Sequence, residues 1–387
     1  MRATFLPFSL PTIEQEEIDE VVDSLKSGWL TTGPKVIRFE DEIRKLTGAP
    51  YVIATNSCTS ALLLCLRALG IGPRDEVITT PLTFAATVNM IVIAGARPVL
   101  ADIDRATLQI DPSQIEKAIT PRTKAIIPVH FAGQPSDLDA IHEIGRRRGI
   151  EIIEDAAHAI GTEYKGQKIG SISKVCVFSF HPIKNITTGE GGAVCTTDPE
   201  LADRIRILRF HGLSKEAWSR YSEKGVAEYE ILEPGFKFNM LDLQAAIGIH
   251  QLKKLDRFTA AKERMVRRYE ESLSGIPGLI LPQRVRYPHR HTWHLYTPLM
   301  DLGRLKIDRT QFIAELKKRK IGAGIHYQAI HHHSYYRETL KIPAGALPNA
   351  DFVSPRIVSL PLYPKMSDQD QSDVIEAVKE VLGLYAA

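Results

Sequence analysis

Short apolar runs alternate with longer amphipathic stretches between residues 51 and 209, and this alternation restricts the fold more than any other feature. The runs are short and β-branched, as in strands that helices cover on both faces. They lie at 51–55, 77–79, 98–102, 124–129, 150–154, 174–180 and 193–197, and helices are expected at 13–27, 35–47, 59–69, 84–94, 112–119, 136–148 and 199–209. We predict a large α/β domain with a mainly parallel mixed sheet, whose ligands bind beyond the carboxyl ends of the strands.

The pattern changes beyond about residue 250, which indicates a second domain. A long charged helix is expected first, and strand-like and helical segments then mix without an internal repeat. The expected elements are a helix over 242–272, a strand over 294–299, a helix over 309–319, a short strand near 322–326 and a helix over 368–383. We therefore expect a large domain over 1–250 and a smaller α+β domain over 251–387, with the first ~12 residues packing against the small domain.

The charge balance and the cysteines exclude several classes of protein. With 49 basic and 46 acidic residues the net charge is +3, which is too balanced for a nucleic-acid or membrane-surface binder. No apolar run approaches ~18 residues, and neither a signal sequence nor an arginine-rich presequence is apparent. Cys58, Cys65, Cys176 and Cys195 lack CxxC spacing, so neither a disulfide framework nor a zinc site is expected. We expect a cytoplasmic protein without membrane insertion.

Polar side chains follow two of the predicted strands. Residues 55–60 join a strand to an apolar helix, and hydroxyls beside N–H groups at a helix start suit a phosphate, although an ordinary Ser/Thr cap is the alternative. Asp155 ends a buried strand, where a carboxylate needs a cation such as a protonated ring nitrogen; a salt bridge or a helix cap would serve equally well. His158, three residues later, is placed either to contact such a ring or to be satisfied in the core.

A lysine lies in the turn after a third strand. Ser179 precedes this turn, Lys184 is within it, and a glycine-rich bend follows at 189–192. A single loop lysine is most often a solvated surface charge, but burial beside a strand end would lower its pKa and suit Schiff-base chemistry. Asp155 and Lys184 are 29 residues apart, on neighbouring predicted strands. A carboxylate, an amine and a phosphate cradle together fit an aldehyde-bearing pyridine cofactor.

The same stretches carry a family resemblance. Residues 154–158 and 178–192, with 27–34 and 234–248, resemble the DegT/DnrJ/EryC1/StrS sugar aminotransferases, and the likeness runs nearly end to end. It implies the type I, aspartate aminotransferase-like fold and pyridoxal 5'-phosphate as cofactor. Within the family the chain looks most like the enzymes that make UDP-4-amino-4-deoxy-L-arabinose for lipid A modification.

The resemblance implies a role for each matching residue. Lys184 would form the Schiff base and move protons, Asp155 would hold the ring nitrogen, and His158 would contact the ring or its 3-oxygen. Further cofactor contacts would come from the phosphate loop with Cys58, Thr59, Ser60 and Ser179, from the stacking ring Phe84, and from Asn239 and Lys237 of a second subunit. The sugar pocket would include Thr31, Thr32, His326 and His331, and no metal is expected.

The activity that the resemblance implies is a ping-pong amino transfer. The donor would be L-glutamate and the acceptor a nucleotide-linked 4-keto sugar, such as a UDP-4-keto-pentose, for a cell-envelope polysaccharide or lipid A. The enzyme would be a homodimer with active sites at the interface. One alternative is a sugar dehydratase on the same fold, but those relatives replace the lysine by histidine, against Lys184. The other is a regulatory homologue without turnover.

Overall fold

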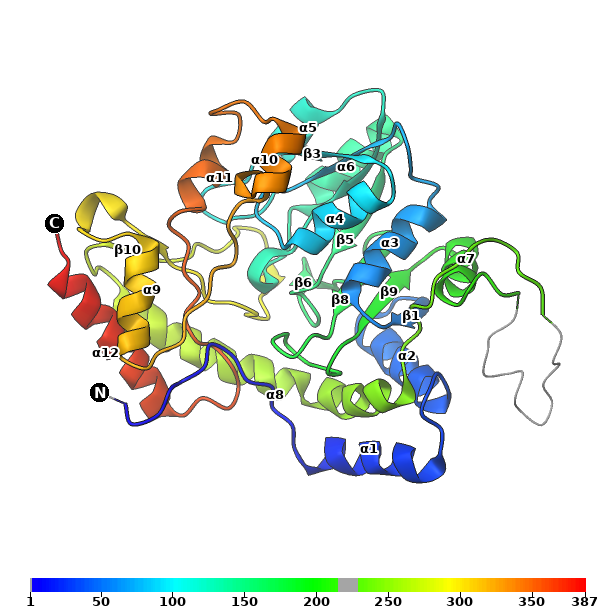
Figure 1. The fold of residues 1–387 in the computed structure, drawn as a ribbon, viewed down its shortest axis with the longest axis horizontal. Coiled ribbons are helices and arrows are strands. Elements are labelled where there is room, and N and C mark those ends of the chain that lie inside the picture. Colours follow the sequence, from blue (N-terminus) through cyan, green and yellow to red (C-terminus); the bar gives the residue numbers. More distant parts are fainter. Residues whose placement is uncertain (1, 215–228) are drawn as a thin grey trace.

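A seven-stranded mixed sheet is the centre of this molecule in the computed structural model, which describes residues 2–214 and 229–387 (Figure 1). The strand order is β1-β9-β8-β5-β4-β2-β3, and β9 alone runs antiparallel to its neighbours. The strands are β1 (Tyr51–Thr55), β2 (Glu76–Thr79), β3 (Arg97–Leu100), β4 (Thr123–Ile127), β5 (Glu151–Asp155), β8 (Val175–Ser179) and β9 (Gly192–Thr196). The predicted α/β class with a mainly parallel mixed sheet is confirmed.

Helices cover both faces of this sheet. Successive strand residues point to opposite sides, so each strand contributes side chains to two apolar cores. In β1, Ile53 joins one apolar core, whereas Val52 and Ala54 join another. The first face packs on α3 (Cys58–Ala68), α4 (Ala85–Ile93) and α7 (Pro199–Arg209); the second packs on α2 (Pro34–Thr47), α5 (Pro112–Ala118), α6 (Leu138–Arg148) and the first half of α8 (Asp242–Leu273). Continuously apolar strands follow from this double cover.

The long helix α8 runs from beneath the sheet into a second apolar core (Figure 1). There its second half packs with α9 (Arg309–Lys318) and α12 (Asp368–Leu384). The N-terminal segment reaches the same region, since Leu6 N–H donates to the Lys320 carbonyl at 2.8 Å. The expected domain boundary at 250/251 falls inside α8, which is continuous there, and the division into two domains stays a prediction.

Two expected strands of the C-terminal part are wrong. Of 294–299 only the last residue enters a strand, β12 (Leu299–Met300). The N–H groups of His294 and Leu295 both donate to the Ala132 carbonyl, and Pro298 has no N–H to donate. Near 322–326 the chain forms only isolated bridges, in which Ile321 pairs with Leu6 and Gly324 with Ser359. The short elements that the pattern did not predict are β6 (Glu163–Tyr164), β7 (Gln167–Lys168), β10 (Leu279–Ile280), β11 (His289–Arg290), α10 (Ser334–Leu340) and α11 (Pro348–Val353).

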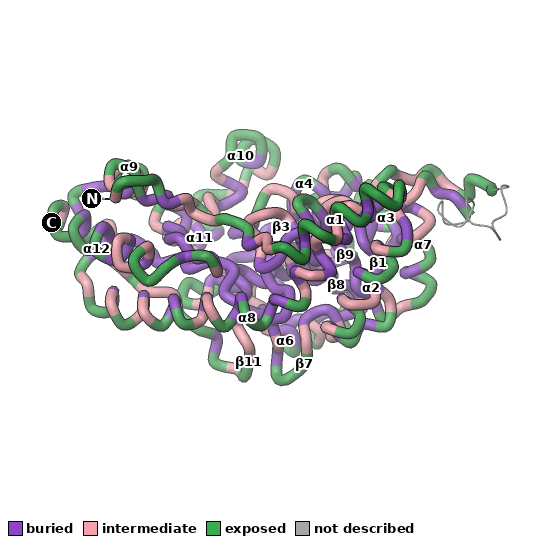
Figure 2. The backbone as a smooth tube through the Cα atoms, turned by 90° about the horizontal axis from the view of Figure 1, so that it is seen from below, coloured by how far each residue is buried: buried purple, intermediate pink, exposed green. Residues whose placement is uncertain are grey.

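Helix α1 (Gln15–Ser27) directs most of its apolar residues away from the molecule. Ile18, Val22 and Leu25 are exposed, whereas Glu17 and Ser24 face α8 and are buried. Most of the helix therefore carries the exposed colour in Figure 2. A row of exposed apolar side chains is typical of a surface that another protein covers.

Candidate active site

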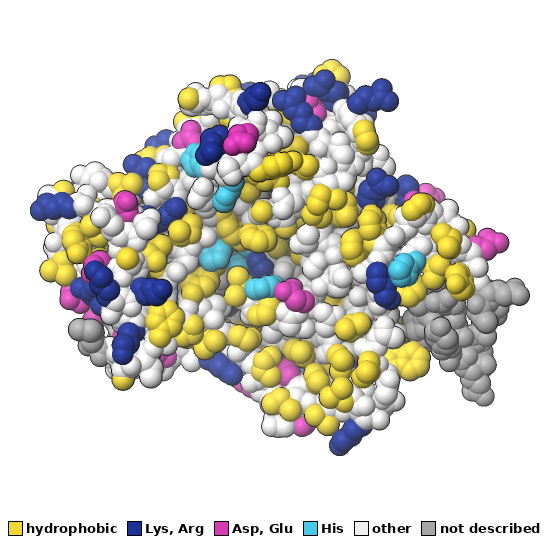
Figure 3. Space-filling model, in the orientation of Figure 1, with side chains coloured by type: hydrophobic (Ala, Val, Ile, Leu, Met, Phe, Trp, Pro, Cys, Tyr) yellow, Lys and Arg dark blue, Asp and Glu magenta, His cyan; other side chains and the backbone are white. Residues whose placement is uncertain are grey.

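A cavity of about 420 Å³ opens at the carboxyl ends of the strands. Its volume falls in the range of small-molecule sites, about 300–1,000 Å³. Histidine side chains surround a hollow near the middle of this face in Figure 3. Of the predicted site residues, the cavity is lined by Cys58, Thr59, Phe84, Asp155, His158, Ser179, Lys184 and His326.

Asp155 is buried at the end of β5, and its hydrogen-bond donors within the described residues are neutral. Its Oδ2 accepts from the Thr87 hydroxyl at 2.7 Å, and its Oδ1 accepts from the Ala157 N–H at 3.1 Å. Burial raises the pKa of this carboxyl, and these two hydrogen bonds oppose the rise. A protonated pyridine nitrogen would supply the missing cation, so Asp155 fits the cofactor that the resemblance implies. Sequence reasoning missed Thr87, whose only signal was its one-turn spacing from Thr83.

Lys184 lies in a closed turn directly after β8. Its N–H donates to the His181 carbonyl at 2.9 Å, and the Thr188 N–H donates to the Phe180 carbonyl at 3.0 Å. Burial lowers the pKa of the Lys184 amine to about 8, because desolvation outweighs the opposing effects of Cys58 and Asp155. A neutral amine at this strand end is the form that attacks a carbonyl carbon.

The start of α3 forms part of the cavity wall. Ser57 caps this helix, since its Oγ accepts the Ser60 N–H at 3.1 Å. Cys58 and Thr59 line the cavity, but the Ser60 hydroxyl donates to Asn56 Oδ1 at 2.6 Å and is absent from the lining. Gly192 of β9 allows this close approach, because a Cβ there would lie 2.5 Å from the Cys58 nitrogen. Backbone and hydroxyl donors at a helix start suit a phosphate.

His158 and Tyr327 connect β5 to the C-terminal part of the chain. The Ala132 N–H donates to His158 Nδ1 at 3.2 Å, which assigns the ring proton to Nε2. His158 Nε2 then donates to the Tyr327 hydroxyl at 3.0 Å. Burial lowers the pKa of His158 well below its ordinary value, so the ring is neutral. Tyr327 was not predicted, and its signal was the neighbouring His326.

Two aromatic side chains stand at the mouth of the cavity. Phe84 is 61% exposed although it lines the site, so one ring face is available to a planar ligand. His326 accepts or donates at Nδ1 to the Ser359 hydroxyl over 2.8 Å, and burial lowers its pKa to about 4. The aromatic part of the cavity edge is therefore uncharged at neutral pH, and Glu190 adds an acidic side chain to the same lining.

Several predicted site residues lie outside this cavity. The Asn239 amide donates to the Thr32 hydroxyl at 2.7 Å, and that hydroxyl donates to the Met240 carbonyl at 2.6 Å. The Thr31 carbonyl accepts the Asp242 N–H at 3.1 Å. The Lys237 amine lies 3.9 Å from the centre of the Phe210 ring. Within the described part of the chain, none of these four predicted residues lines the cavity.

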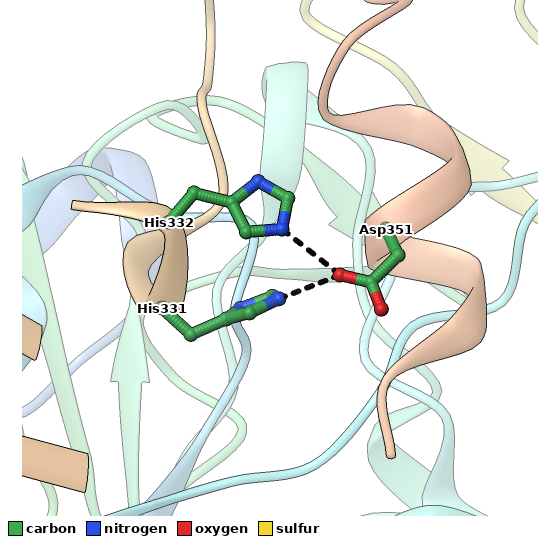
Figure 4. A group of neighbouring side chains, drawn as sticks. All are labelled: His331, His332 and Asp351. Atoms are coloured by element: carbon green, nitrogen blue, oxygen red, sulfur yellow. Dashed lines mark hydrogen bonds and ion pairs between the residues drawn. The ribbon is translucent and has the colours of Figure 1, made fainter. Parts of the chain in front are cut away.

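His331 turns toward Asp351 of α11 instead of toward the cavity (Figure 4). His331 Nε2 and His332 Nε2 share Asp351 Oδ1 at 2.8 and 2.9 Å. The ligand atoms of this group lie within 4.8 Å of one another. The two hydrogen bonds to one oxygen account for this closeness.

None of the helices in the described ranges combines the length and the apolar character needed to cross a membrane.

The sequence and the fold were compared with known proteins. The model of the DegT/DnrJ/EryC1/StrS aminotransferase family matches residues 11–379. The spore coat polysaccharide biosynthesis protein SpsC of Bacillus subtilis is 51% identical, with 98% of each chain covered. Spr1654 of Streptococcus pneumoniae, a proposed sugar aminotransferase solved in PMP and PLP forms, gives TM-scores of 0.91 and 0.90 at 35% and 34% identity, with 98% and 99% of the two chains covered. PseC of Helicobacter pylori, an aminotransferase of pseudoaminic acid biosynthesis, gives 0.91 at 29% identity, with 99% and 100% covered.

Proposed function

The chain belongs to the DegT/DnrJ/EryC1/StrS aminotransferase family, and on that basis we propose that it moves the amino group of L-glutamate to a nucleotide-linked 4-keto sugar. It is a sugar aminotransferase, and pyridoxal phosphate is its cofactor. The proposed product is an amino sugar for a cell-envelope polysaccharide. The name of SpsC, a spore coat polysaccharide biosynthesis protein, supports this assignment.

One observation carries the proposed chemistry: Asp155 and Lys184 meet in one cavity, and burial shifts the pKa of each toward its uncharged form. When bound, the cofactor supplies an electrophilic carbon and an electron-accepting ring. Lys184 would bind that carbon and afterwards carry a proton between substrate atoms. Asp155 would hold the ring nitrogen protonated, and His158 would orient the ring. Cys58 and Thr59 at the start of α3, with Ser179 of β8, would hold the phosphate. Ser60 would join them only if its hydroxyl leaves Asn56 Oδ1.

The sugar pocket that we propose begins at the mouth of the cavity. His326 lines this mouth and would contact the sugar. Thr31, Thr32, Asn239 and Lys237 lie outside the cavity of their own chain, so we assign them to the site of a second copy in a homodimer. Because His331 is bound to Asp351, we propose that His331 does not contact the sugar itself. It would affect the sugar pocket indirectly, by fixing the segment that also carries His326. A UDP-4-keto-pentose and a role in lipid A modification remain the narrower form of the proposal.

The homodimer and the cellular location are part of the same proposal. The exposed apolar residues Ile18, Val22 and Leu25 of α1 support a protein partner, and a second copy is the proposed one. All four cysteines are free and buried, which supports a reducing cytoplasm.

Substitution of the proposed nucleophile tests the assignment. Lys184→Ala should abolish the visible absorbance of bound pyridoxal phosphate and lower turnover by at least ~10³-fold, because the covalent link and the proton carrier are both lost. The exposed Lys318→Ala serves as the control and should keep both. Retention of absorbance and turnover in Lys184→Ala would overturn the assignment.

A substrate scan separates the proposal from its alternatives. Release of 2-oxoglutarate from glutamate before any sugar is added would support the ping-pong order. Recovery of the original spectrum on adding UDP-, GDP- or dTDP-linked keto sugars would then identify the acceptor. A sugar dehydratase would consume sugar without 2-oxoglutarate, and a regulatory homologue would bind the cofactor without either product.

A further inference from the structure

A second lysine lies buried behind the turn that holds Lys184. Lys262 of α8 is 3% exposed, and its Nζ donates to Asn185 Oδ1 at 3.0 Å. Asn185 directly follows Lys184 in the chain, and its own amide faces the Thr292 carbonyl at 3.4 Å. Lys262 therefore contacts the backbone neighbour of the proposed nucleophile rather than the nucleophile itself.

The surroundings of Lys262 differ from those of the other buried lysine in α8. Lys254, two turns earlier, has the carboxylates of Glu14, Glu16 and Glu17 within 3.0 Å. In the described part of the chain, no carboxylate lies within 4.0 Å of Lys262, and burial alone lowers its pKa to about 7. A buried amine without a counter-charge is costly. Such costly groups are typical of functional sites.

A narrow slot connects the two lysines. It has a volume of about 20 Å³, which suits a single water molecule, and both Lys184 and Lys262 line it. Two further lining residues, Thr12 and His294, have the buried atoms Oγ1 and Nε2 without a hydrogen-bond partner. The back of the lysine turn is thus a small chamber with unpaired polar atoms. Lys184 lies between this chamber and the large cavity, since it lines both.

We propose that Lys262 is a positioning residue for Lys184, an inference that rests on the proposed function. Its hydrogen bond fixes the Asn185 amide, and the Thr292 carbonyl fixes the other end of that amide. The backbone that carries Lys184 is then held from behind, so its amine stays directed into the large cavity. An amine donates this hydrogen bond whether charged or neutral, so the contact persists near neutral pH.

The test compares four variants with the wild type, all loaded with pyridoxal phosphate: Lys262→Met, Lys262→Arg, Asn185→Ala and the double variant Lys262→Met/Asn185→Ala. Lys262→Met should keep the cofactor but weaken the visible circular dichroism of its absorption band, which reports how firmly the attached lysine is held. The kcat should fall by roughly tenfold with the KM for the sugar nearly unchanged. Lys262→Arg keeps a donor and should restore both readouts. The double variant Lys262→Met/Asn185→Ala should lose no more kcat and circular dichroism than either single variant, because both substitutions remove the same hydrogen bond.

Lys254→Met is the matched control, since it removes an equally long, buried side chain from the same helix. We expect it to lower the free energy of unfolding while the visible circular dichroism and the kcat of the folded protein stay at the wild-type level. Wild-type signals in Lys262→Met would overturn the positioning role alone. A wild type that shows no cofactor absorption band at all would overturn the proposed function and this inference together.

Discussion

Asp155, Lys184 and Lys262 are buried at the lysine turn, and in the described part of the chain none of them has a charged partner at hydrogen-bond distance. Burial raises the pKa of Asp155 and lowers those of Lys184 and Lys262. Each group is thereby pushed toward its uncharged form. The free protein is less stable for this reason. In the proposed function the bound cofactor would relieve part of this cost, because it would bring a cation to Asp155 and a covalent partner to Lys184.

Asp155→Asn should stabilise the cofactor-free protein and disable the loaded one. A carboxyl whose folded-state pKa is raised contributes stability that is complete below its ordinary pKa and lost as the pH rises through the folded-state value. The wild type should therefore lose stability between acid and neutral pH where the variant does not, which denaturant unfolding at several pH values measures. Turnover of the variant should fall by at least ~10²-fold, because nothing holds the ring nitrogen protonated. The exposed Asp139→Asn should change neither property.

Lys262→Met should raise the stability of the cofactor-free protein at pH 7. The folded-state pKa of about 7 lies below the ordinary lysine value, so the cost is complete below pH 7 and disappears as the pH rises toward about 10.4. Removing the amine removes a destabilisation on the order of 4 kcal/mol. The Asn185 oxygen loses its hydrogen-bond donor, which offsets about 1–3 kcal/mol of that gain. Between pH 7 and 10, the free energy of unfolding should change less with pH in the variant than in the wild type. An equally steep rise of the free energy of unfolding with pH in both proteins would contradict the prediction.

Among the elements, α1 shows best what a periodic pattern leaves open. Its apolar spacing predicted a helix, and the helix is present, but its buried side carries Glu17 and Ser24. Glu17 is buried because Lys254 and Gln251 of α8 meet its two carboxylate oxygens at 2.8 and 2.9 Å. This charged contact joins segments more than 230 residues apart, and no local pattern encodes it.

Glu17→Ala should detach α1 from α8. Loss of this buried carboxylate leaves Lys254 with its more exposed partners only, and we expect the free energy of unfolding to fall by roughly 3 kcal/mol. Denaturant unfolding measures the loss. Glu16→Ala removes another carboxylate of the same lysine, but an exposed one, and should have little effect. Equal effects of the two substitutions would show that the burial of a carboxylate does not determine how much its ion pair with Lys254 stabilises the fold.

Sequence reasoning was most successful where one strand end carries one chemical group. The sheet, its flanking helices and the meeting of Asp155 with Lys184 follow from strands that end at a common edge. It failed where the contact crosses from one part of the chain to another. Tyr327 was missed because its hydroxyl meets His158 from far along the sequence. The strand expected over 294–299 was wrong because the N–H groups of His294 and Leu295 donate to the distant Ala132 carbonyl instead of to a neighbouring strand. The orientation of His331 depended on Asp351, which no motif joined to it.

At the scale of the whole molecule, the outward apolar side of α1 makes assembly testable. Leu25→Glu places a charge among exposed apolar residues, and we expect it to dissociate the proposed homodimer, with a Kd raised at least ~100-fold. Sedimentation at micromolar concentration measures this change. Turnover should fall in parallel, since each proposed site takes Asn239 and Lys237 from the other copy. Leu384→Glu, which alters an equally exposed leucine at the end of α12, should remain dimeric.

The pairing of β1 with β9 determines when this molecule can fold during its synthesis. Tyr51 pairs with Thr196, α1 rests on α8, and Arg2 forms ion pairs with Asp370 and Asp373. The first fifty-five residues thus leave the ribosome long before their partners exist. Contacts of such high sequence separation form slowly, because a long loop must close first. The early segments, with the apolar side of α1 among them, therefore stay unpaired in the nascent chain until β9 and α8 have been made.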